Sequence, residues 1–372
     1  MESAIFSLGD NLRHPISGEF LTESERHQQL IRYSVWASES GFDAVHIGEH
    51  HFNDYMLSSP PVVLSAIGQQ VPDLILSTAV TLVPTLDPVR AAEDYSTLEN
   101  LFPGRVEIVA GRGNFFSRSY PAFGLDVTNA RAIFDEKLAL LQRLLREENI
   151  SWAGEFREPL DDITVRPRPT DEIPLWIGAG STTSALLAAK LGCRLMLPSV
   201  FGHPKMFVPI IEQYREAWHD AGRSEEDIVI GSCCHAFAGT SHADMRERFT
   251  PRYDHYWTFV DQLISDNTGG KVQMPFDLES FLAGPAVAGS SQECVDRIAE
   301  LHELLGHNRQ LFMFALGGVS DSELEETVRR FGEEVLPLLP SQGSATPLTD
   351  VFGDPYSFSE SRVCDGGACA DT

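Results

Sequence analysis

The chain has 372 residues, of which 42% are hydrophobic and 22% are charged, a composition typical of a globular protein with a sizeable core. It carries 28 lysines and arginines against 54 aspartates and glutamates, so its formal net charge is −26. Such an acidic surface repels nucleic-acid phosphates and anionic membranes, which argues against both as partners and favours a cytoplasmic location.

The first half of the chain alternates short apolar strands with longer helical segments. Thr22 and Glu25 form a capping box at the start of one helix, and Asp87 followed by Pro88 marks the start of another. Strands are expected at 4–8, 44–48, 74–82 and 106–110, and helices at 22–40, 59–71, 87–101 and 128–147.

The second half repeats this alternation. Strands are expected at 175–178, 195–197, 228–238 and 310–316, and helices at 181–191, 204–221, 291–305 and 320–339. Eight strand–helix units in a chain of this length predict an α/β fold of the (β/α)8 TIM-barrel type rather than an open, doubly wound sheet. We expect one domain that covers residues 1–340.

Two insertions and a tail interrupt this pattern. The segment 149–169 is expected to form a hairpin between units four and five. The segment 241–288 is longer and less regular, and it follows strand seven, where a lid or a substrate wall is expected. Residues 341–372 are rich in Ser, Gly, Pro and Asp and are expected to form a flexible tail, which contains Cys364 and Cys369. The six cysteines show no repeated metal-ligand spacing, so reduced thiols are expected.

Polar and glycine-rich residues gather at the ends of four consecutive expected strands. In a TIM barrel the loops after the strands build the active site, so these segments are the predicted site. They are residues 48–52, 77–81, 111–114 and 178–184.

The segment 178–184 has the features of an anion site, because two glycines precede a helix that begins with Ser and Thr. Free backbone N–H groups and the positive end of the helix dipole favour a phosphate there. Arg112 lies between two glycines at the end of the neighbouring strand and could bind the same phosphate. The alternatives are plain helix capping by Ser181 and a surface salt bridge of Arg112.

Several histidines fall near the end of the second strand. Alternation along the strand places His46 and His50 on one face and Glu49 on the other. No partner set elsewhere has the spacing of a zinc site, so no metal is expected. His50, where the strand enters the catalytic face, is a candidate general base or hydrogen-bond partner, and His235 is a weaker candidate for the pocket wall.

These segments resemble the bacterial luciferase-like monooxygenase family over roughly residues 1–340. The residues that carry the resemblance are Glu49-His50-His51-Phe52, the run from Leu82 to Gly113, Trp176-Ile177-Gly178-Ala179-Gly180-Ser181 and Gly289-Ser290-Ser291-Gln292-Glu293-Cys294. The run from Leu82 to Gly113 is the most specific of these.

The resemblance implies a TIM barrel that binds FMN, with the phosphate on Arg112, Ser181 and Ser184. It places a non-proline cis peptide at Ala79–Val80, under the isoalloxazine ring. His50 matches the histidine that is important for the reaction of reduced flavin with oxygen.

Two departures from luciferase involve glycines. Gly180 stands where luciferase has a glutamate, so a side-chain contact is lost. Gly111 stands where luciferase has a cysteine near the reactive ring edge, and we expect it to open space for oxygen or for a bulkier substrate.

The full set of expected site residues follows from the motifs and the resemblance together. The catalytic residue is His50, the cofactor-binding residues are Ala79, Val80, Gly111, Arg112, Asn114, Gly180, Ser181 and Ser184, and the substrate-pocket residues are Glu49, His51, Phe115 and His235.

The implied function is that of a two-component monooxygenase. A separate flavin reductase supplies reduced FMN, and a flavin hydroperoxide formed with O2 oxidises a small organic substrate in a pocket that excludes water. A dimer is expected by analogy. The alternatives are a deazaflavin-dependent hydride-transfer enzyme on the same barrel and a non-catalytic flavin-binding relative.

Overall fold

The computed structural model describes residues 1–113 and 118–339. The expected site residues Asn114 and Phe115, and the expected tail from residue 341, therefore lie outside the described residues.

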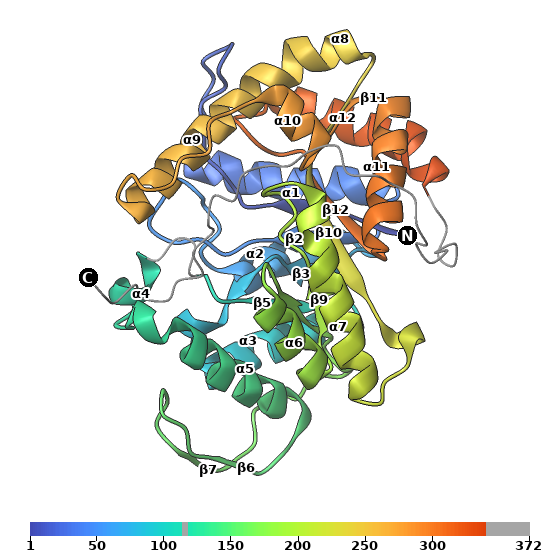
Figure 1. The fold of residues 1–372 in the computed structure, drawn as a ribbon. Coiled ribbons are helices and arrows are strands. Elements are labelled where there is room, and N and C mark those ends of the chain that lie inside the picture. Colours follow the sequence, from blue (N-terminus) through green and yellow to red (C-terminus); the bar gives the residue numbers. More distant parts are fainter. Residues whose placement is uncertain (114–117, 340–372) are drawn as a thin grey trace, which may run out of the picture.

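Parallel strands form a barrel at the centre of the molecule (Figure 1). The strands, in the order of their hydrogen-bonded path, are β3 (Ile75–Thr78), β2 (Ala44–Ile47), β1 (Glu2–Ser7), β12 (Arg309–Met313), β10 (Ile230–Gly239), β9 (Arg194–Met196), β8 (Leu175–Gly178), β5 (Ile108–Gly111) and β4 (Thr81–Leu82). The two ends of this path, β3 and β4, are successive parts of one stretch of chain, and an additional bridge joins Leu76 to Val106. The path therefore closes on itself with eight positions around the ring, and the predicted TIM barrel is confirmed.

Helices surround the barrel, and their start signals are those read in the sequence. Thr22 and Glu25 form the predicted capping box, and the Asp87 side chain accepts from the N–H groups of Val89 and Arg90. The helices are α1 (Glu23–Glu39), α2 (Pro60–Gly68), α3 (Pro88–Leu101), α4 (Ser119–Ala122), α5 (Ala130–Arg146), α6 (Thr182–Leu191), α7 (Val208–Asp220), α11 (Ser291–Leu305) and α12 (Asp321–Glu334). In the described part of the chain no helix combines the length and the apolar character needed to cross a bilayer.

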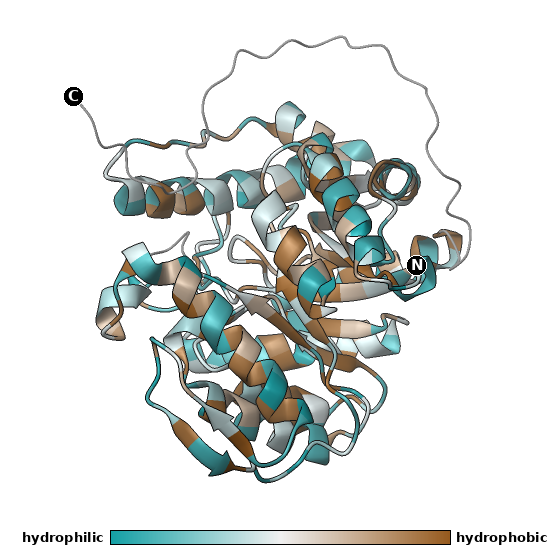
Figure 2. Ribbon diagram, turned by 60° about the horizontal axis from the view of Figure 1, so that its bottom comes forward, coloured by the Kyte–Doolittle hydropathy of each residue, from teal (hydrophilic) through white to brown (hydrophobic). Residues whose placement is uncertain are grey.

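Alternation along the strands separates two hydrophobic cores. Ile5, Ile108 and Ile177 belong to the core between the barrel and the helices, whereas Phe6 and Trp176 belong to the core inside the barrel. Figure 2 shows the strands as mainly hydrophobic and the helices as mixed, which is expected when strands are buried on both faces and helices on one.

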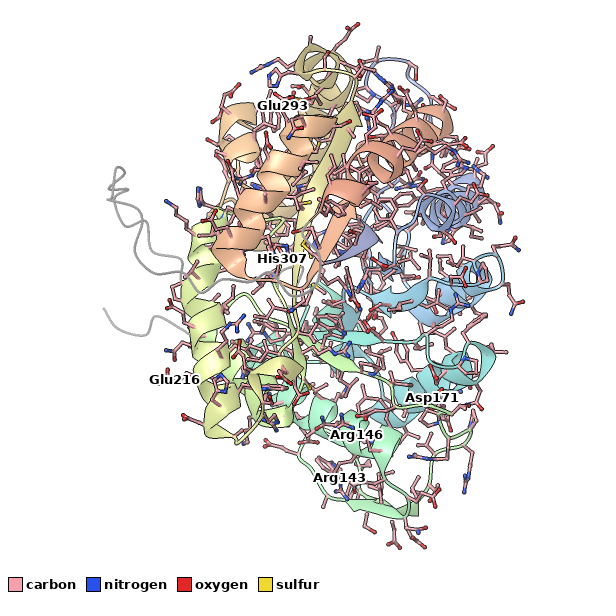
Figure 3. All side chains as sticks on the ribbon, turned by 90° about the vertical axis from the view of Figure 1, so that its right-hand side faces the viewer. Arg143, Arg146, Asp171, Glu216, Glu293 and His307 are labelled. Carbon is pink, nitrogen blue, oxygen red and sulfur yellow. The ribbon has the colours of Figure 1, made fainter. Side chains whose placement is uncertain are left out.

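The first insertion is the predicted hairpin, made of β6 (Ile150–Trp152) and β7 (Leu160–Ile163). It follows α5 and precedes β8, so it lies at the end of the barrel where the strands begin. Figure 3 shows Arg143 and Arg146, on the last turn of α5, at this end, and Glu293, in the first turn of α11, at the other end.

The second insertion is far more regular than expected. It contains α8 (His242–Asp244), a helical turn at Met245–Phe249, α9 (Thr250–Thr268), α10 (Leu278–Ala283) and β11 (Ala286–Ser290). The expectation of an irregular segment was wrong because aromatic side chains recur along α9 at helical spacing. Strand β11 was missed because it pairs only with the outer half of β10, from His235 to Gly239.

Candidate active site

The carboxyl ends of β2, β4, β5 and β8 meet at one end of the barrel. β2 pairs with β3, β4 pairs with β5, and β5 pairs with β8, all in parallel register. The four polar strand ends predicted from the sequence therefore lie next to one another, at the end where a TIM barrel places its site. In Figure 1 the insertion with α8, α9 and α10 lies over one side of the barrel.

The loop after β2 is fixed by Glu49, a carboxylate that is 3% exposed. The backbone N–H of Glu49 donates to the carbonyl of Val80 at 2.9 Å, and its Oε2 accepts from the N–H of Leu82 at 2.8 Å. Its other oxygen, Oε1, lies 2.7 Å from Nε2 of His51. Both carboxylate oxygens are hydrogen-bonded, which holds the loop against the third barrel strand.

His50 is half-buried, and its ring stacks on Tyr55 with the centroids 4.3 Å apart. Its backbone N–H donates to the carbonyl of Leu57 at 2.8 Å. Burial, with a smaller contribution from His51, lowers the pKa of His50 to about 3. At neutral pH the side chain is therefore a neutral imidazole, which can donate a hydrogen bond from one nitrogen and accept at the other.

A pair of tyrosines links the His50 loop to the insertion. The hydroxyl oxygens of Tyr55 and Tyr256, the latter on α9, are 3.1 Å apart, and the Tyr55 ring packs edge-on against Phe259 at 5.1 Å. Burial raises the pKa of both tyrosines, so both keep their protons. The surface beneath His50 is thus shared between the barrel and α9.

His51 faces an accessible aromatic surface. Its ring meets Phe123 edge-on at 4.9 Å, and Phe123 lies 5.8 Å from Phe52. Phe52 is 60% exposed and Phe123 is 43% exposed. Two phenyl rings beside a held imidazole form a surface on which a planar apolar molecule could rest.

The third barrel strand has the predicted cis peptide bond at Ala79–Val80. This bond separates β3 from β4, and it lies against the end of β2, because a Cβ atom added to Gly48 would be 2.6 Å from the carbonyl oxygen of Ala79. A glycine is required at position 48 for this close approach.

Gly111 does not open the space that was expected of it. A Cβ atom added to Gly111 would lie 2.1 Å from Cγ2 of Val80, and one added to Gly178 would lie 3.1 Å from Cγ1 of the same side chain. Val80 therefore occupies the volume that two glycines leave on β5 and β8. The expectation was wrong because the space left by the missing side chain of Gly111 is filled by the side chain of Val80.

The start of α6 fits the predicted anion cradle. Ser181 is the N-cap residue, but its side chain does not cap the helix, and its Oγ lies 3.3 Å from Oγ of Ser184. The backbone N–H groups of Thr182 and Thr183 donate to no acceptor in residues 1–113 or 118–339. Gly180 is exposed beside this turn, and a Cβ atom there would meet only Cγ of Pro198, at 3.3 Å.

Arg112 follows β5, the strand next to β8. It is half-buried, and its carbonyl accepts a hydrogen bond from the Tyr120 hydroxyl at 2.5 Å. Burial raises the pKa of Tyr120 to about 12 against the opposing effect of the Arg112 charge. Since β5 pairs with β8, the strand that leads into α6, the Arg112 guanidinium follows the strand next to the uncapped start of that helix.

His235, the expected pocket-wall residue, is buried. It is 1% exposed, and its Nδ1 is 3.0 Å from the hydroxyl of Tyr253 on α9. The ring also packs edge-on against Tyr256 and Trp257, and burial lowers its pKa to about 3. The structure thus places His235 in the contact between the barrel and α9.

His46 belongs to a polar cluster in the barrel interior. Its Nδ1 is 3.1 Å from the carbonyl of Thr78, and its Nε2 is 3.5 Å from Arg309, which pairs with Glu107 and with Glu2. Burial and then the Arg309 charge lower the pKa of His46 to about 3. Among the described residues no three His, Cys, Asp or Glu side chains are placed to share a metal ion.

Tyr55 and Phe123 were not predicted from the sequence, and neither was the hydrogen bond between Tyr256 and Tyr55. Tyr55 lies four residues after the Glu49–His51 run, and loop aromatics so close to a candidate site are a usable signal. The spacing of Phe249, Tyr253, Tyr256 and Val260 is that of one helix face, which would have shown that Tyr256 points toward the barrel.

Residues 1–308 match the family described as luciferase-like monooxygenase. One similar protein is the alkanal monooxygenase alpha chain of Photorhabdus luminescens, which is 25% identical over 86% of this chain and 93% of its own length. Another is an F420-dependent glucose-6-phosphate dehydrogenase of Segniliparus rotundus, which is 28% identical over 55% of this chain and 64% of its own length.

Solved structures share the fold. A monooxygenase of Streptomyces bottropensis superposes with a TM-score of 0.79 at 23% identity, over 91% of this chain and 99% of that one. The oxygenating constituent of 3,6-diketocamphane monooxygenase of Pseudomonas putida, in complex with FMN, superposes with a TM-score of 0.73 at 17% identity over the same shares.

Proposed function

The chain belongs to the luciferase-like monooxygenase family, and from this premise we propose that it is a two-component monooxygenase that uses reduced FMN and O2 to oxidise a small organic substrate. The observation that carries the proposal is the uncapped start of α6, with the paired hydroxyls of Ser181 and Ser184, beside β5, the strand that Arg112 follows. The family also contains F420-dependent oxidoreductases, so an oxidoreductase is the broader class.

The FMN phosphate would be held by Arg112, Ser181, Ser184 and the first-turn N–H groups of α6. Free N–H groups, hydroxyl donors and a guanidinium are the groups that bind a phosphate dianion, and the helix dipole adds to them. Gly180 leaves the approach to this turn open.

The flavin ring would rest on the Ala79–Val80 segment, with Gly111 on the next strand. Val80 fills the volume above Gly111 and Gly178, so it forms an apolar surface of fixed shape. When bound, reduced FMN supplies the two-electron chemistry with O2, and the protein's part is to position it and to exclude water.

His50 would act as a neutral hydrogen-bond partner. Since its pKa lies near 3, it holds no extra proton across the physiological range, so the imidazole can accept at one nitrogen and donate at the other. Tyr55, stacked on the ring and bonded to Tyr256, keeps the imidazole in one orientation.

A deazaflavin cofactor is the second candidate, and the similarity to an F420-dependent dehydrogenase favours it. Deazaflavin-dependent enzymes transfer hydride and do not use O2, so the two candidates differ in both cofactor and co-substrate. A separate flavin reductase, a location in the cytoplasm and a dimer through helices of the first half are parts of the proposal. A groove of about 510 Å³ between α1 and α2, lined by Trp36 and Ala66 among others, lies on that half.

Anaerobic titration with reduced FMN and with reduced F420, followed by mixing with aerated buffer, tests the proposal. We expect reduced FMN to bind more tightly, and the Ser181→Ala/Ser184→Ala double variant and Arg112→Ala each to weaken binding by about 10-fold or more, since a hydrogen bond to a charged group is worth roughly 1.5–3 kcal/mol. Arg166→Ala, on the remote hairpin, should leave the affinity unchanged.

His50→Ala should keep the affinity for reduced FMN but bring the time course of flavin reoxidation closer to that of free flavin. Tighter binding of F420 than of FMN would replace the monooxygenase with the hydride-transfer enzyme. Failure of both cofactors to bind would leave the non-catalytic relative as the surviving hypothesis.

A further inference from the structure

The contacts of Glu49 restrict the chemical state of His51. Glu49 Oε2 accepts the N–H of Leu82 at 2.8 Å, and Oε1 lies 2.7 Å from His51 Nε2. An ionised carboxylate only accepts hydrogen bonds, so Nε2 must carry the hydrogen. The lone pair of the neutral ring is then on Nδ1.

The pair is built into the protein and is not a surface contact. The Glu49 side chain is 2% exposed and the His51 side chain 11% exposed. Glu49 cannot turn away, since its second oxygen is bound to the backbone of β4 and its own N–H to Val80. By contrast, the similar pair of His219 and Glu225 has side chains 47% and 54% exposed.

We propose that Glu49 and His51 form an acid–base pair for the substrate, in which Glu49 is the positioning residue and His51 Nδ1 accepts a proton from the hydroxyl of an aromatic or enolic substrate. The accessible rings of Phe52 and Phe123 beside His51 fit a planar, apolar molecule of this class. The inference rests on the proposed function, because it assigns the substrate of the same site.

The proton transfer is balanced within the pair. The O–H bond of the substrate breaks and its electron pair stays on the oxygen, while a bond forms between the proton and His51 Nδ1. The resulting imidazolium keeps its Nε2–H bond to Glu49, whose negative charge stabilises it. An ionised phenol or enol is more electron-rich and is therefore oxidised more readily.

The first test is the tautomer of His51 in the full-length protein without flavin, measured by NMR with histidine ring nitrogens labelled by 15N. The wild type should show Nε2–H and an unprotonated Nδ1, with signals assigned by their loss in His51→Asn. In Glu49→Gln the single amide oxygen is needed by Leu82 N–H, so the amide NH2 faces His51 and the tautomer should reverse to Nδ1–H.

Glu225→Gln is the control, because it makes the same substitution in an exposed carboxylate next to another histidine. It should leave the His51 signals as they are in the wild type. An Nδ1–H tautomer in the wild type would overturn the proposal, and this result depends on no variant being folded.

The second test uses 4-nitrophenol at pH 6, with and without oxidised FMN, and follows the yellow phenolate by absorbance. The wild type should ionise bound 4-nitrophenol beyond the fraction found in free solution, and Glu49→Gln and His51→Asn should not. The methyl ether 4-nitroanisole, which has no proton to give, should compete for the same place.

No excess ionisation in the wild type, or no binding of 4-nitrophenol, would overturn the assignment of the substrate class. Neither test requires reduced FMN or O2. Failure of the pair is thereby distinguished from failure of the proposed monooxygenase, which is judged by the binding of reduced FMN.

Discussion

Val80, Gly111 and Gly178 form one packing unit at the centre of the site. Val80 lies between β3 and β4, Gly111 is in β5 and Gly178 is in β8, and the two glycines leave room for the two methyl groups of Val80. The glycine at 111 suggests an enlarged cavity when it is read alone. The packing of the three segments shows that Val80 fills the space beside both glycines.

At position 111 we expect Gly111→Ala to destabilise the protein by about 1–3 kcal/mol, because the new methyl group would overlap Val80. The free energy of unfolding in urea measures this. The control is Gly180→Ala, whose methyl group meets only Pro198 at 3.3 Å and should change stability by less than about 0.5 kcal/mol.

The double variant Gly111→Ala/Val80→Ala separates crowding from other causes. If overlap with Val80 is the reason, the second substitution should restore part of the lost stability. Additive losses would show that Gly111 is needed for something other than the space taken by Val80.

At the scale of elements, the contact between α9 and the barrel depends on aromatic side chains. Tyr253, Tyr256 and Trp257 are each at most 1% exposed, and Tyr253 and Tyr256 reach His235 and Tyr55. Along α9 the insertion is thus packed firmly against the barrel.

We expect Tyr256→Phe to cost about 1 kcal/mol, since one buried hydrogen bond is lost, and to speed hydrogen exchange of the α9 amides and of the loop around Tyr55. Hydrogen–deuterium exchange followed by mass spectrometry measures both segments. Tyr214→Phe is the control, because it removes a comparable buried hydroxyl, 2.9 Å from the carbonyl of Cys193, far from α9. Equal acceleration of α9 in both variants would argue against a specific tie.

Most elements of the barrel could be predicted from the sequence, because each strand and helix carries a local signal. Thr22 with Glu25 fixed the start of α1, and the apolar run at 175–178 coincides with β8. The insertion was harder because β11, Ala286–Ser290, runs directly into α11 and pairs only with the outer half of β10.

The candidate site was predictable to the extent that it follows strand ends. Glu49, His50 and Ser181 were singled out in this way, whereas the cis bond at Ala79–Val80, which the structure has, was placed through the family resemblance. The contacts of Tyr256 with Tyr55 and of Tyr253 with His235 were not predicted, because the spacing along α9 shows which face is buried but not which barrel residues that face meets.

At the scale of the whole molecule, histidines far apart in the chain are buried in the neutral form. His46, His235 and His307 are each at most 1% exposed, and burial lowers the pKa of each to about 3. In the unfolded chain a histidine titrates near 6.5, so between these two values the unfolded state binds more protons than the folded state.

The sign of this linkage gives a pH dependence. As the pH falls from 6.5 toward 3, each of these histidines should remove up to about 1.4 kcal/mol of stability per pH unit. The free energy of unfolding in urea should therefore fall between pH 7 and pH 5. His307→Asn should make this slope shallower by up to about 1.4 kcal/mol per pH unit, which corresponds to one proton fewer taken up on unfolding. The same slope in the variant and the wild type would mean that His307 is protonated in the folded state.

The first and last barrel strands are neighbours. Glu2 of β1 is in register with Arg309 of β12, and their side chains form an ion pair of 2.7 Å. Because the ring is closed, the chain could begin at another strand and still build the same barrel with the same neighbouring strands. In evolutionary terms, we expect a circular permutation of the coding sequence to conserve the site, because the strand ends that build it are held by their neighbours in the ring and not by their distance from the start of the chain.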